Sequence, residues 1–361
     1  MQSIHDVAKA AGVSITTVSR ALNGYGDVSE KTRQRILRVA KELGYHPNAA
    51  ARNLRGKRTQ TVAFAPYLRQ YTGPHAQQQM EPHPFFKEFI GMLAFDCIEY
   101  NLSLLVTLPH SGQSSMEMYQ ELAGSGRVDG VILANIQAED ARIALLQELN
   151  LPFVAFGRTL NEGDESYPFV DVDSRTGMAK LVQYLVEQGH RQLAYLSDPL
   201  DVSYAYFRQR GYLEALQLHG LSQHPALMTL DLQTQEEVSE AIARMLALPA
   251  ESAPTALVVS NDDLALQVLA ALRARGRAIG KEAGQLAVAS FDDLPFAAFV
   301  NPALTTIRQP MAVLSKLVLE LLVQILKQEV SSLEVNSSFP LVQLAPKQFL
   351  IEPDLIIRAS G

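Results

Sequence analysis

The chain has 361 residues, 47% of them hydrophobic, and a formal net charge of −7. This length predicts two or three domains with buried cores, and no stretch reaches the roughly 18 to 20 consecutive apolar residues that a membrane-spanning helix needs. The single cysteine, Cys97, excludes an intrachain disulfide and a cysteine-based metal cluster, and its apolar helical setting predicts a buried core thiol.

The charge is unevenly distributed along the chain. Residues 1–58 carry eleven Lys or Arg against four Asp or Glu, a net charge of +7, and the rest of the chain carries −14. A basic amino-terminal module attached to an acidic body is typical of a nucleic-acid reader whose other domain has a different task. The start of the chain lacks the apolar core of a signal peptide, so we expect a cytoplasmic protein.

Two short helices are predicted at the start. The first opens at Ser3 with the spacing of a capping box and ends at Gly12, and the second opens at Ser14. At 100° per residue the second helix separates a packing stripe from an opposite contact face. The stripe holds Val18, Ala21 and Leu22, and the contact face holds Thr16 and Arg20. Two helices joined by a turn with Gly are typical of a helix-turn-helix, although any small helical hairpin shows the same spacing.

A third helix is predicted from Ser29, a plausible N-cap, to Gly44. Its apolar stripe consists of Ile36, Leu37, Ala40 and Leu43. Its basic residues are Lys31, Arg33, Arg35 and Arg38, which fit either an ordinary solvated face or contacts to phosphates. Because the neighbouring helix presents Arg20, the pattern favours phosphate contacts.

These residues resemble a known family. The runs that carry the resemblance are Ile4-His5-Asp6-Val7-Ala8, Ala11-Gly12-Val13-Ser14, Thr17-Val18-Ser19-Arg20-Ala21-Leu22-Asn23, Val28-Ser29, Lys31-Thr32-Arg33 and Leu43-Gly44-Tyr45-His46-Pro47-Asn48. They closely resemble the DNA-binding headpiece of the lactose/galactose repressor (LacI/GalR) family, and the resemblance extends to the final strand. It implies that Ile15, Thr16 and Arg20 read base edges in the major groove. It further implies backbone contacts from Ser14, Thr17, Ser19, Lys31 and Arg33.

The segment 48–56 contains three consecutive alanines and favours a helix, yet an isolated helix this short is marginal in water. The family resemblance implies a hinge helix that folds when two subunits pair over DNA. Its minor-groove contacts would be Asn48, Ala51 and Leu54, with Leu54 wedged between base steps. The alternative is a plain linker.

From Thr61 onward, short β-rich runs alternate with helical periods. Strands are predicted at 62–65, 102–108, 128–133, 153–156, 193–197, 256–260 and 286–291, and helices at 86–100, 116–123, 138–149, 176–188, 207–218, 236–248, 264–275 and 311–327. Such alternation predicts parallel sheets with helices on both faces. The expected fold is an all-α helix-turn-helix headpiece plus an α/β periplasmic-binding-protein-like body of two doubly wound parallel-sheet subdomains.

The predicted boundaries are a headpiece at 1–46, a hinge or linker at 47–59 and an effector-binding and dimerisation domain at 60–361. The resemblance divides the body into an N-subdomain (about 60–169 and 309–338) and a C-subdomain (about 170–308 and 339–361). The tail 355–360 shows no following heptads, so we expect a homodimer rather than a coiled-coil tetramer.

Catalytic templates are missing from the sequence. It has no His-Glu-x-x-His, no P-loop and no Gly-x-Ser-x-Gly, and the adjacent acidic pair Asp292-Asp293 does not suit glycosidic chemistry, which needs two carboxylates from separate elements. We therefore expect no enzyme, no catalytic residue, no metal and no cofactor.

Sugar recognition needs planar polar groups that grip vicinal hydroxyls and aromatic surfaces for the ring face. The resemblance implies effector contacts from Arg208, in Arg-x-x-Gly, from Asp292 at a strand end, and from the aromatic pair Phe85 and Phe86. Two further candidates are Arg158 and Asn261, which also follow strands. Capping the next helix explains Asn261 equally well.

The Gln-rich loop from Tyr67 to Pro82 is either a lid over the cleft or a surface loop, and the sequence favours neither. Asp171 and Asp173 lie on the same side of an extended segment at the subdomain crossover, and one of them can cap the helix near Thr176. Their run and Ala141-Arg142-Ile143 resemble relatives that control oligosaccharide or α-glucoside uptake.

The sequence thus predicts a homodimeric repressor of carbohydrate uptake or catabolism genes that binds a pseudo-palindromic DNA operator and is released by a sugar effector. The alternative is a corepressor-dependent regulator that responds to a purine or another small metabolite. A transport protein would share the body but has no use for a basic headpiece.

Overall fold

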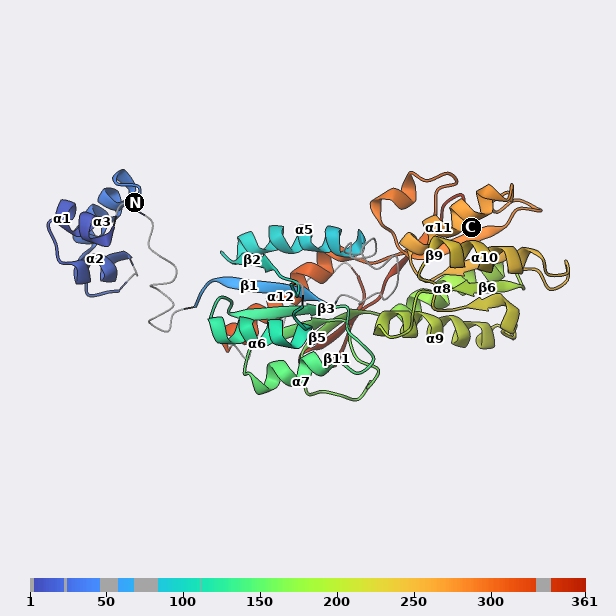
Figure 1. The fold of residues 1–361 in the computed structure, drawn as a ribbon, viewed down its shortest axis with the longest axis horizontal. Coiled ribbons are helices and arrows are strands. Elements are labelled where there is room, and N and C mark those ends of the chain that lie inside the picture. The colour runs from blue at the N-terminus through green and yellow to red at the C-terminus, as the bar shows by residue number, and fades with distance from the viewer. Residues whose placement is uncertain (1–2, 23–24, 46–57, 68–83, 111, 329–338) are drawn as a thin grey trace. The chain divides into compact units, whose positions relative to one another are not determined.

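The computed structural model describes residues 3–22, 25–45, 58–67, 84–110, 112–328 and 339–361. The chain divides into two compact units, Met1–Thr59 and Gln60–Gly361 (Figure 1). The predicted hinge contacts Asn48, Ala51 and Leu54 lie outside the described residues, as does the predicted loop from Tyr67 to Pro82 except for Tyr67.

The amino-terminal unit is a three-helix bundle made of α1 (Ile4–Ala11), α2 (Ile15–Leu22) and α3 (Glu30–Glu42). Each helix begins at a predicted serine cap, because the hydroxyl oxygens of Ser3, Ser14 and Ser29 accept hydrogen bonds from backbone N–H groups of the first turn. The buried core consists of Val7, Ala8, Ala11, Val18, Ala21, Val28, Ile36 and Ala40. Leu37 does not belong to it, contrary to the prediction. Its position beside Ile36 turns it by 100° towards solvent, where it is 43% exposed.

The first sheet of the body has seven strands in the order β11-β12-β5-β4-β3-β1-β2. All neighbours are parallel except β11 and β12, which form an antiparallel pair. The strands are β1 (Thr61–Pro66), β2 (Ser103–Val106), β3 (Gly130–Ala134), β4 (Phe153–Phe156), β5 (Phe169–Val172), β11 (Leu341–Ala345) and β12 (Gln348–Ile351). Helices cover both faces, as predicted. They are α5 (Pro84–Glu99) and α12 (Met311–Lys327) on one face, and α6 (Ser115–Ser125) and α7 (Ala141–Glu148) on the other.

The second sheet has six strands in the order β13-β10-β9-β8-β6-β7, with only β13 antiparallel to its neighbour. The strands are β6 (Leu193–Leu196), β7 (Met228–Thr229), β8 (Ala256–Val259), β9 (Ala287–Asp292), β10 (Thr305–Arg308) and β13 (Asp354–Ile356). Its two faces are covered by α8 (Ser174–Glu187) with α9 (Ser203–Leu218), and by α10 (Gln235–Leu246) with α11 (Asp262–Ala274). Two 3-10 helices, η1 (Pro225–Leu227) and η2 (Pro295–Ala298), complete this half.

The division of the tail between the two halves differs from the prediction. Residues 339–361 were expected in the C-subdomain, but β11 and β12 belong to the first sheet, where Phe349 pairs with Val170 of β5. The chain therefore passes between the sheets after β5, after β10 and after β12. Strand-by-strand patterns reveal extended segments but not their partners. No strand was predicted for β7, β10, β11, β12 or β13, and β5 was expected only as an extended segment around Asp171 and Asp173.

Helices α8 and α9 pack closely at Gly211. A Cβ atom at this position would lie 2.7 Å from both the Cα and the carbonyl oxygen of Arg175 on α8, so only glycine permits the observed backbone approach. This contact fixes the position of the first turn of α8 against α9.

Gly211→Ala should lower the free energy of unfolding by about 1–3 kcal/mol, because backbone atoms cannot yield as a flexible side chain does. Gly124→Ala is the matched control. It lies in α6 with nothing within 4 Å of its added Cβ, and it should stabilise by about 0.4–1 kcal/mol. Urea unfolding of both variants measures the difference, and equal midpoints would contradict the tight contact.

Candidate functional site

Polar side chains gather at the carboxyl ends of the second sheet's strands. Asp198 follows β6, Asn261 follows β8, Asp292 ends β9 and Gln309 follows β10. Helix α9 adds Arg208, the predicted effector arginine. Parallel sheets bind ligands at this edge, because the carboxyl ends of neighbouring strands meet there.

Arg208 and Asp292 form a buried ion pair, with 4% and 2% of each residue exposed. The Nη2 of Arg208 lies 2.8 Å from Oδ1 of Asp292, and its Nη1 donates to the carbonyl oxygen of Ser260 at 2.6 Å. The same carboxylate oxygen accepts a hydrogen bond from Nε2 of Gln309 at 2.6 Å. Within the described part of the chain, the buried Nε of Arg208 has no hydrogen-bond partner. The pair is therefore held firmly, and one buried donor of Arg208 is left without a partner among the described residues.

Aromatic rings flank this guanidinium. The Cζ of Arg208 lies 3.9 Å from the centroid of Phe291 and 4.8 Å from that of Tyr204. The hydroxyl of Tyr204 donates to Asp198 at 2.5 Å, and Ser260 Oγ donates to the other oxygen of that carboxylate at 2.6 Å. Burial, and then the Asp198 carboxylate, raise the pKa of Tyr204 well above its ordinary value, so its hydroxyl keeps its proton.

Asp262 is a supporting residue that sequence reasoning missed. It is fully buried and accepts hydrogen bonds from the hydroxyls of Ser290 and Thr306 and from the backbone N–H of Leu294. Burial, and then the neighbouring Asp292 carboxylate, raise the pKa of Asp262. These bonds join β9, β10 and the turn after β9, where Asp292 has the unusual φ of 123°. The sequence offered only its position after Asn261 as a signal.

Asn261 acts as the N-cap of α11. Its side-chain oxygen accepts the backbone N–H of Leu264 at 2.8 Å. The capping explanation is therefore confirmed, and an effector contact from Asn261 stays a prediction. Asp173 likewise caps α8 by accepting the N–H of Thr176 at 3.0 Å.

Arg158 comes from the first sheet and reaches an element of the second. Its Nε donates to Asp171 at 3.2 Å, and its Cζ lies 4.2 Å from the ring centroid of Phe207 on α9. Burial raises the pKa of Asp171 to about 6, although the Arg158 guanidinium opposes this shift. The guanidinium thus bridges the two halves of the body beside the predicted effector arginine.

Phe85 and Phe86 lie in the first turn of α5 and are 6% and 8% exposed. Phe85 stacks on Phe156 with centroids 5.7 Å apart, and Phe86 packs at 5.9 Å against Phe64. These contacts account for both rings as part of the aromatic core of the first sheet. Their role in effector binding stays a prediction.

Arg142 is a second residue whose importance the sequence did not reveal. It is buried, pairs with Asp140 at 2.5 Å and donates to the carbonyl oxygens of Ala134 and Asn135. It thereby holds the loop that follows β3. A helical arginine after an acidic residue usually lies at the surface, so the pattern gave no signal of this burial.

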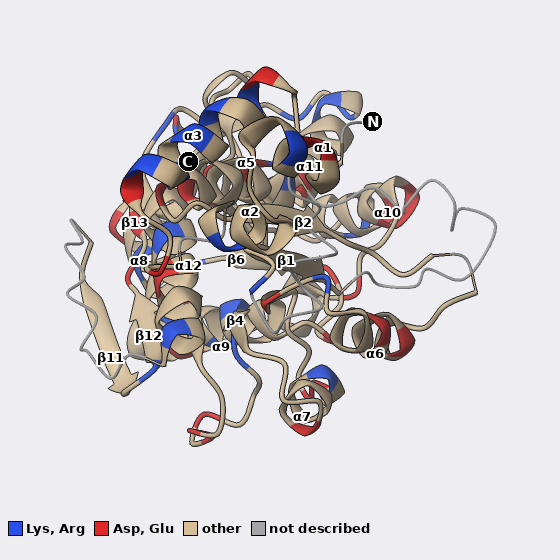
Figure 2. Ribbon diagram, turned by 90° about the vertical axis from the view of Figure 1, so that its left-hand side faces the viewer, with Lys and Arg blue, Asp and Glu red and all other residues tan. Residues whose placement is uncertain are grey.

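The contact face of α2 is exposed as predicted. Ile15, Thr16 and Arg20 are exposed, and Arg20 pairs with Asp27 at 2.5 Å. Basic residues lie along α3 itself (Figure 2), and Lys31 among them is exposed. Arg33 instead donates to the carbonyl oxygen of Tyr25 at 2.5 Å and so holds the turn before α3.

The described ranges hold neither a metal site nor a membrane-spanning helix. No group of three or more His, Cys, Asp or Glu side chains there fits a metal ion, and none of these helices is long and apolar enough to cross a membrane. Cys97 is buried, as predicted, and burial raises the pKa of its thiol to about 11.

A helix-turn-helix unit with an exposed basic surface, joined in one chain to a two-sheet body with a polar strand-end site, defines a class of protein: the ligand-responsive DNA-binding regulators. Comparisons with known proteins agree. A family model described as bacterial regulatory proteins, lacI family, matches residues 3–48, and a periplasmic binding protein-like domain matches residues 182–360.

The chain is similar over most of its length to characterised regulators. It is 32% identical to the HTH-type transcriptional regulator AglR of Rhizobium meliloti (strain 1021), over 79% of this chain and 77% of the relative. It is 30% identical to the HTH-type transcriptional regulator CelR of Thermobifida fusca, over 98% and 97%. The chain belongs to the LacI family and is a DNA-binding transcriptional regulator.

Two solved structures share the whole fold. A complex of the transcriptional regulator CelR with cellobiose is 28% identical and covers all of both chains with a TM-score of 0.68. The lac repressor dimer bound to operator and the anti-inducer ONPF is 25% identical, covers 99% of this chain and 98% of its own, and has a TM-score of 0.75. The predicted fold class is confirmed.

Proposed function

We propose that this regulator is a homodimeric repressor of carbohydrate uptake or catabolism genes and that a sugar bound between the two sheets releases it from its operator. The observation that carries the proposal is the buried pair of Arg208 and Asp292 at the strand ends, where the buried Arg208 Nε has no hydrogen-bond partner in the described part of the chain. A charged fork of this kind suits hydroxyl groups that sit on neighbouring carbons.

Aromatic surfaces beside the pair support a sugar. The chain has no tryptophan, so Tyr204, Phe207 and Phe291 are the rings that lie next to the arginines of the site. One solved relative is titled a complex with cellobiose. Cellobiose and related oligosaccharides are therefore the first ligands to test.

A corepressor-dependent regulator that responds to a purine is the second candidate. Repressors named PurR, from Erwinia tasmaniensis, and CytR, from Escherichia coli, are each 29% identical to this chain. This identity does not exceed that of AglR or CelR, so the comparisons give the purine alternative no additional weight.

An exposed apolar surface supports the homodimer. On α5, Met92, Phe95 and Ile98 are 41%, 74% and 72% exposed, and Val106 of the edge strand β2 is 44% exposed. Helix α5 packs beside β2, so these side chains share one side of the first sheet. Apolar patches of this kind on soluble proteins typically mark interfaces between subunits. One solved relative is a dimer bound to operator.

Ile15 and Thr16 are proposed to read base edges from the exposed face of α2. Replacing both, with Ile15→Tyr and Thr16→Gln, should change the selected operator sequence, because a good base contact discriminates by about 1–3 kcal/mol. Lys31→Gln is the control, since a phosphate contact weakens binding to all sequences alike. Selection from random DNA measures the consensus, and an unchanged consensus in the double variant would refute this role.

Arg208→Gln and Asp292→Asn should keep operator binding but lose the effector response, since each removes one half of the buried fork. Asp293→Asn is the matched control, because its carboxylate pairs with Arg308 and Arg358 instead. Calorimetry with cellobiose, other oligosaccharides and purines identifies the ligand, and operator-release titrations compare the variants. Normal release by the Asp292 variant would show that the site lies elsewhere.

Phe95→Glu should weaken self-association, because it places a charge in the apolar surface of α5. Leu218→Glu offers a control at the end of α9, where leucine is 81% exposed and no dimer contact is proposed. Analytical ultracentrifugation of both full-length variants gives the monomer–dimer constant. We expect at least a tenfold loss for Phe95→Glu, corresponding to about 1.4 kcal/mol, and no loss for Leu218→Glu.

A further inference from the structure

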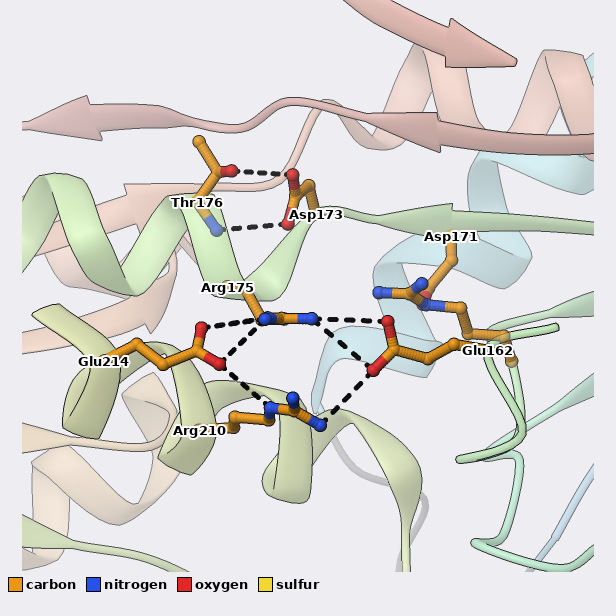
Figure 3. A network of polar contacts seen from close by, with 8 residues as sticks. Glu162, Asp171, Asp173, Arg175, Thr176, Arg210 and Glu214 are labelled. Carbon is orange, nitrogen blue, oxygen red and sulfur yellow. Dashed lines mark hydrogen bonds and ion pairs between the residues drawn. The ribbon is translucent and has the colours of Figure 1, made fainter. Parts of the chain in front are cut away.

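Four charged side chains form a continuous network between the two halves of the body (Figure 3). Glu162 lies in the loop after β4 of the first sheet, whereas Arg175 lies in the first turn of α8, and Arg210 and Glu214 lie on α9. Both of these helices pack on the second sheet. We call these four residues the inter-sheet latch. Glu162 is its single member from the first half.

The ion pairs run through both arginines. Nη1 of Arg175 lies 3.2 Å from Oε2 of Glu162, while its Nη2 lies 2.7 Å from Oε1 of Glu214. Arg210 makes the same two connections, at 3.4 Å to Glu162 and 2.9 Å to Glu214. Glu162 is therefore shared by two cations that the second half presents.

The backbone holds these cations in place. Gly211 lets α9 approach the backbone of Arg175 on α8, so the first turn of α8 stands beside Arg210 and Glu214. The intra-half pairs to Glu214 orient both guanidinium groups, which leaves little side-chain entropy to lose when Glu162 joins them. The network is thus preformed on one side and completed by one residue from the other.

The latch lies next to the proposed effector contacts along the chain. Glu162 follows Arg158 by four residues in the same loop, and Arg210 follows Arg208 by two residues on α9. Asp171 and Asp173, at the first passage of the chain between the sheets, precede Arg175 (Figure 3). A change in the angle between the sheets that moves Arg158 away from Phe207 also moves Glu162 relative to Arg175 and Arg210.

We propose that the inter-sheet latch is an electrostatic regulator of the angle between the two halves, in which Glu162 favours the arrangement seen here. This inference rests on the proposed function only in assuming that the angle controls operator release. Side chains of the latch are 30% to 44% exposed, so water and salt screen the pairs. The expected effect of removing Glu162 is accordingly about a two- to five-fold change in the ratio of the two arrangements.

Removing the charge of Glu162 and removing the charge of Glu214 should have different effects on the angle between the two halves. Glu162→Gln removes the connection between the halves and should populate a second, more open arrangement, and Glu162→Lys should do so more strongly through repulsion. Glu214→Gln removes intra-half pairs. Both arginines are then less neutralised, which strengthens their attraction to Glu162, and less ordered, which weakens it, so we expect the two effects to offset and the parent arrangement to persist. A network that contributed only general stability would make both glutamine variants behave alike.

Pulsed electron paramagnetic resonance reports on this angle through the distance between two nitroxide labels, one on each half of the body. Nitroxides are attached to Gln120→Cys on α6 and Gln217→Cys on α9, both exposed positions, while buried Cys97 with its raised thiol pKa stays unlabelled. Excess unlabelled protein ensures that each dimer carries at most one labelled chain. The full-length protein is used without DNA or sugar, and circular dichroism confirms folding.

A second distance population that grows from the parent through Glu162→Gln to Glu162→Lys, but not in Glu214→Gln, supports the latch. Equal distributions in all variants, or equal shifts in both glutamine variants, overturn it. Glu162→Asp, which keeps the charge, should retain the parent distribution. Because this measurement uses neither operator nor effector, its result tests the latch independently of the proposed function. Operator titrations of the same variants then report whether the angle controls DNA binding.

Discussion

Burial of the Arg208 guanidinium is the constraint on which the site depends. A charge removed from water costs several kcal/mol unless partners replace its hydration. The protein supplies them from three neighbouring strands: Asp292 and the ring of Phe291 on β9, the carbonyl oxygen of Ser260 after β8, and Gln309 after β10, which shares the Asp292 carboxylate. The site is therefore assembled only when these strands stand in register. Its polar groups are ordered before a ligand arrives, which reduces the entropy lost on binding.

Hydrogen bonds and ion pairs from the surrounding residues stabilise the cluster of Asp262, Asp292 and Asp293. Burial, and then the nearby Asp292 carboxylate, raise the pKa of Asp262, yet three donors hold its side chain. Those bonds tie β9 to β10 and fix the turn in which Asp292 takes its positive φ. Asp293, the next residue, points to Arg308 and Arg358. Asp292 thus pairs with Arg208 in the proposed effector site, whereas Asp293 forms ion pairs that stabilise the surrounding structure.

Sequence reasoning was strongest where the controlling interactions are local. Serine caps and the stripe of small apolar residues predicted the three headpiece helices, because their hydrogen bonds join residues three positions apart. It was weaker where partners are distant. The tail 339–361, which holds β11 and β12, was assigned to the wrong half from the family resemblance, and no local pattern in these short runs identifies β5 as the neighbour of β12.

Burial of polar residues was the other gap. Asp262 is placed inside the protein by Thr306, a partner 44 residues away, and Arg142 donates to the carbonyl oxygen of Ala134 as well as pairing with the nearby Asp140. Glu162 meets Arg210 across 48 residues, a separation at which helical or strand periodicity carries no information. Arg208 and Asp292 were found from the family resemblance, whereas their mutual contact, 84 residues apart, came from the structure.

Helix α9 connects ligand chemistry with domain geometry. Its residues 207–211 make four different contacts. Phe207 packs against Arg158, Arg208 lies in the strand-end site, Arg210 belongs to the latch and Gly211 packs against α8. A ligand shifts an equilibrium only by the difference in its affinity for the two states, and allosteric coupling of this kind is typically worth about 1–3 kcal/mol. Half-exposed ion pairs contribute about 0–1 kcal/mol each. The latch is thus large enough to adjust the resting angle and too small to prevent an effector from changing it, which is the balance that a reversible regulator requires.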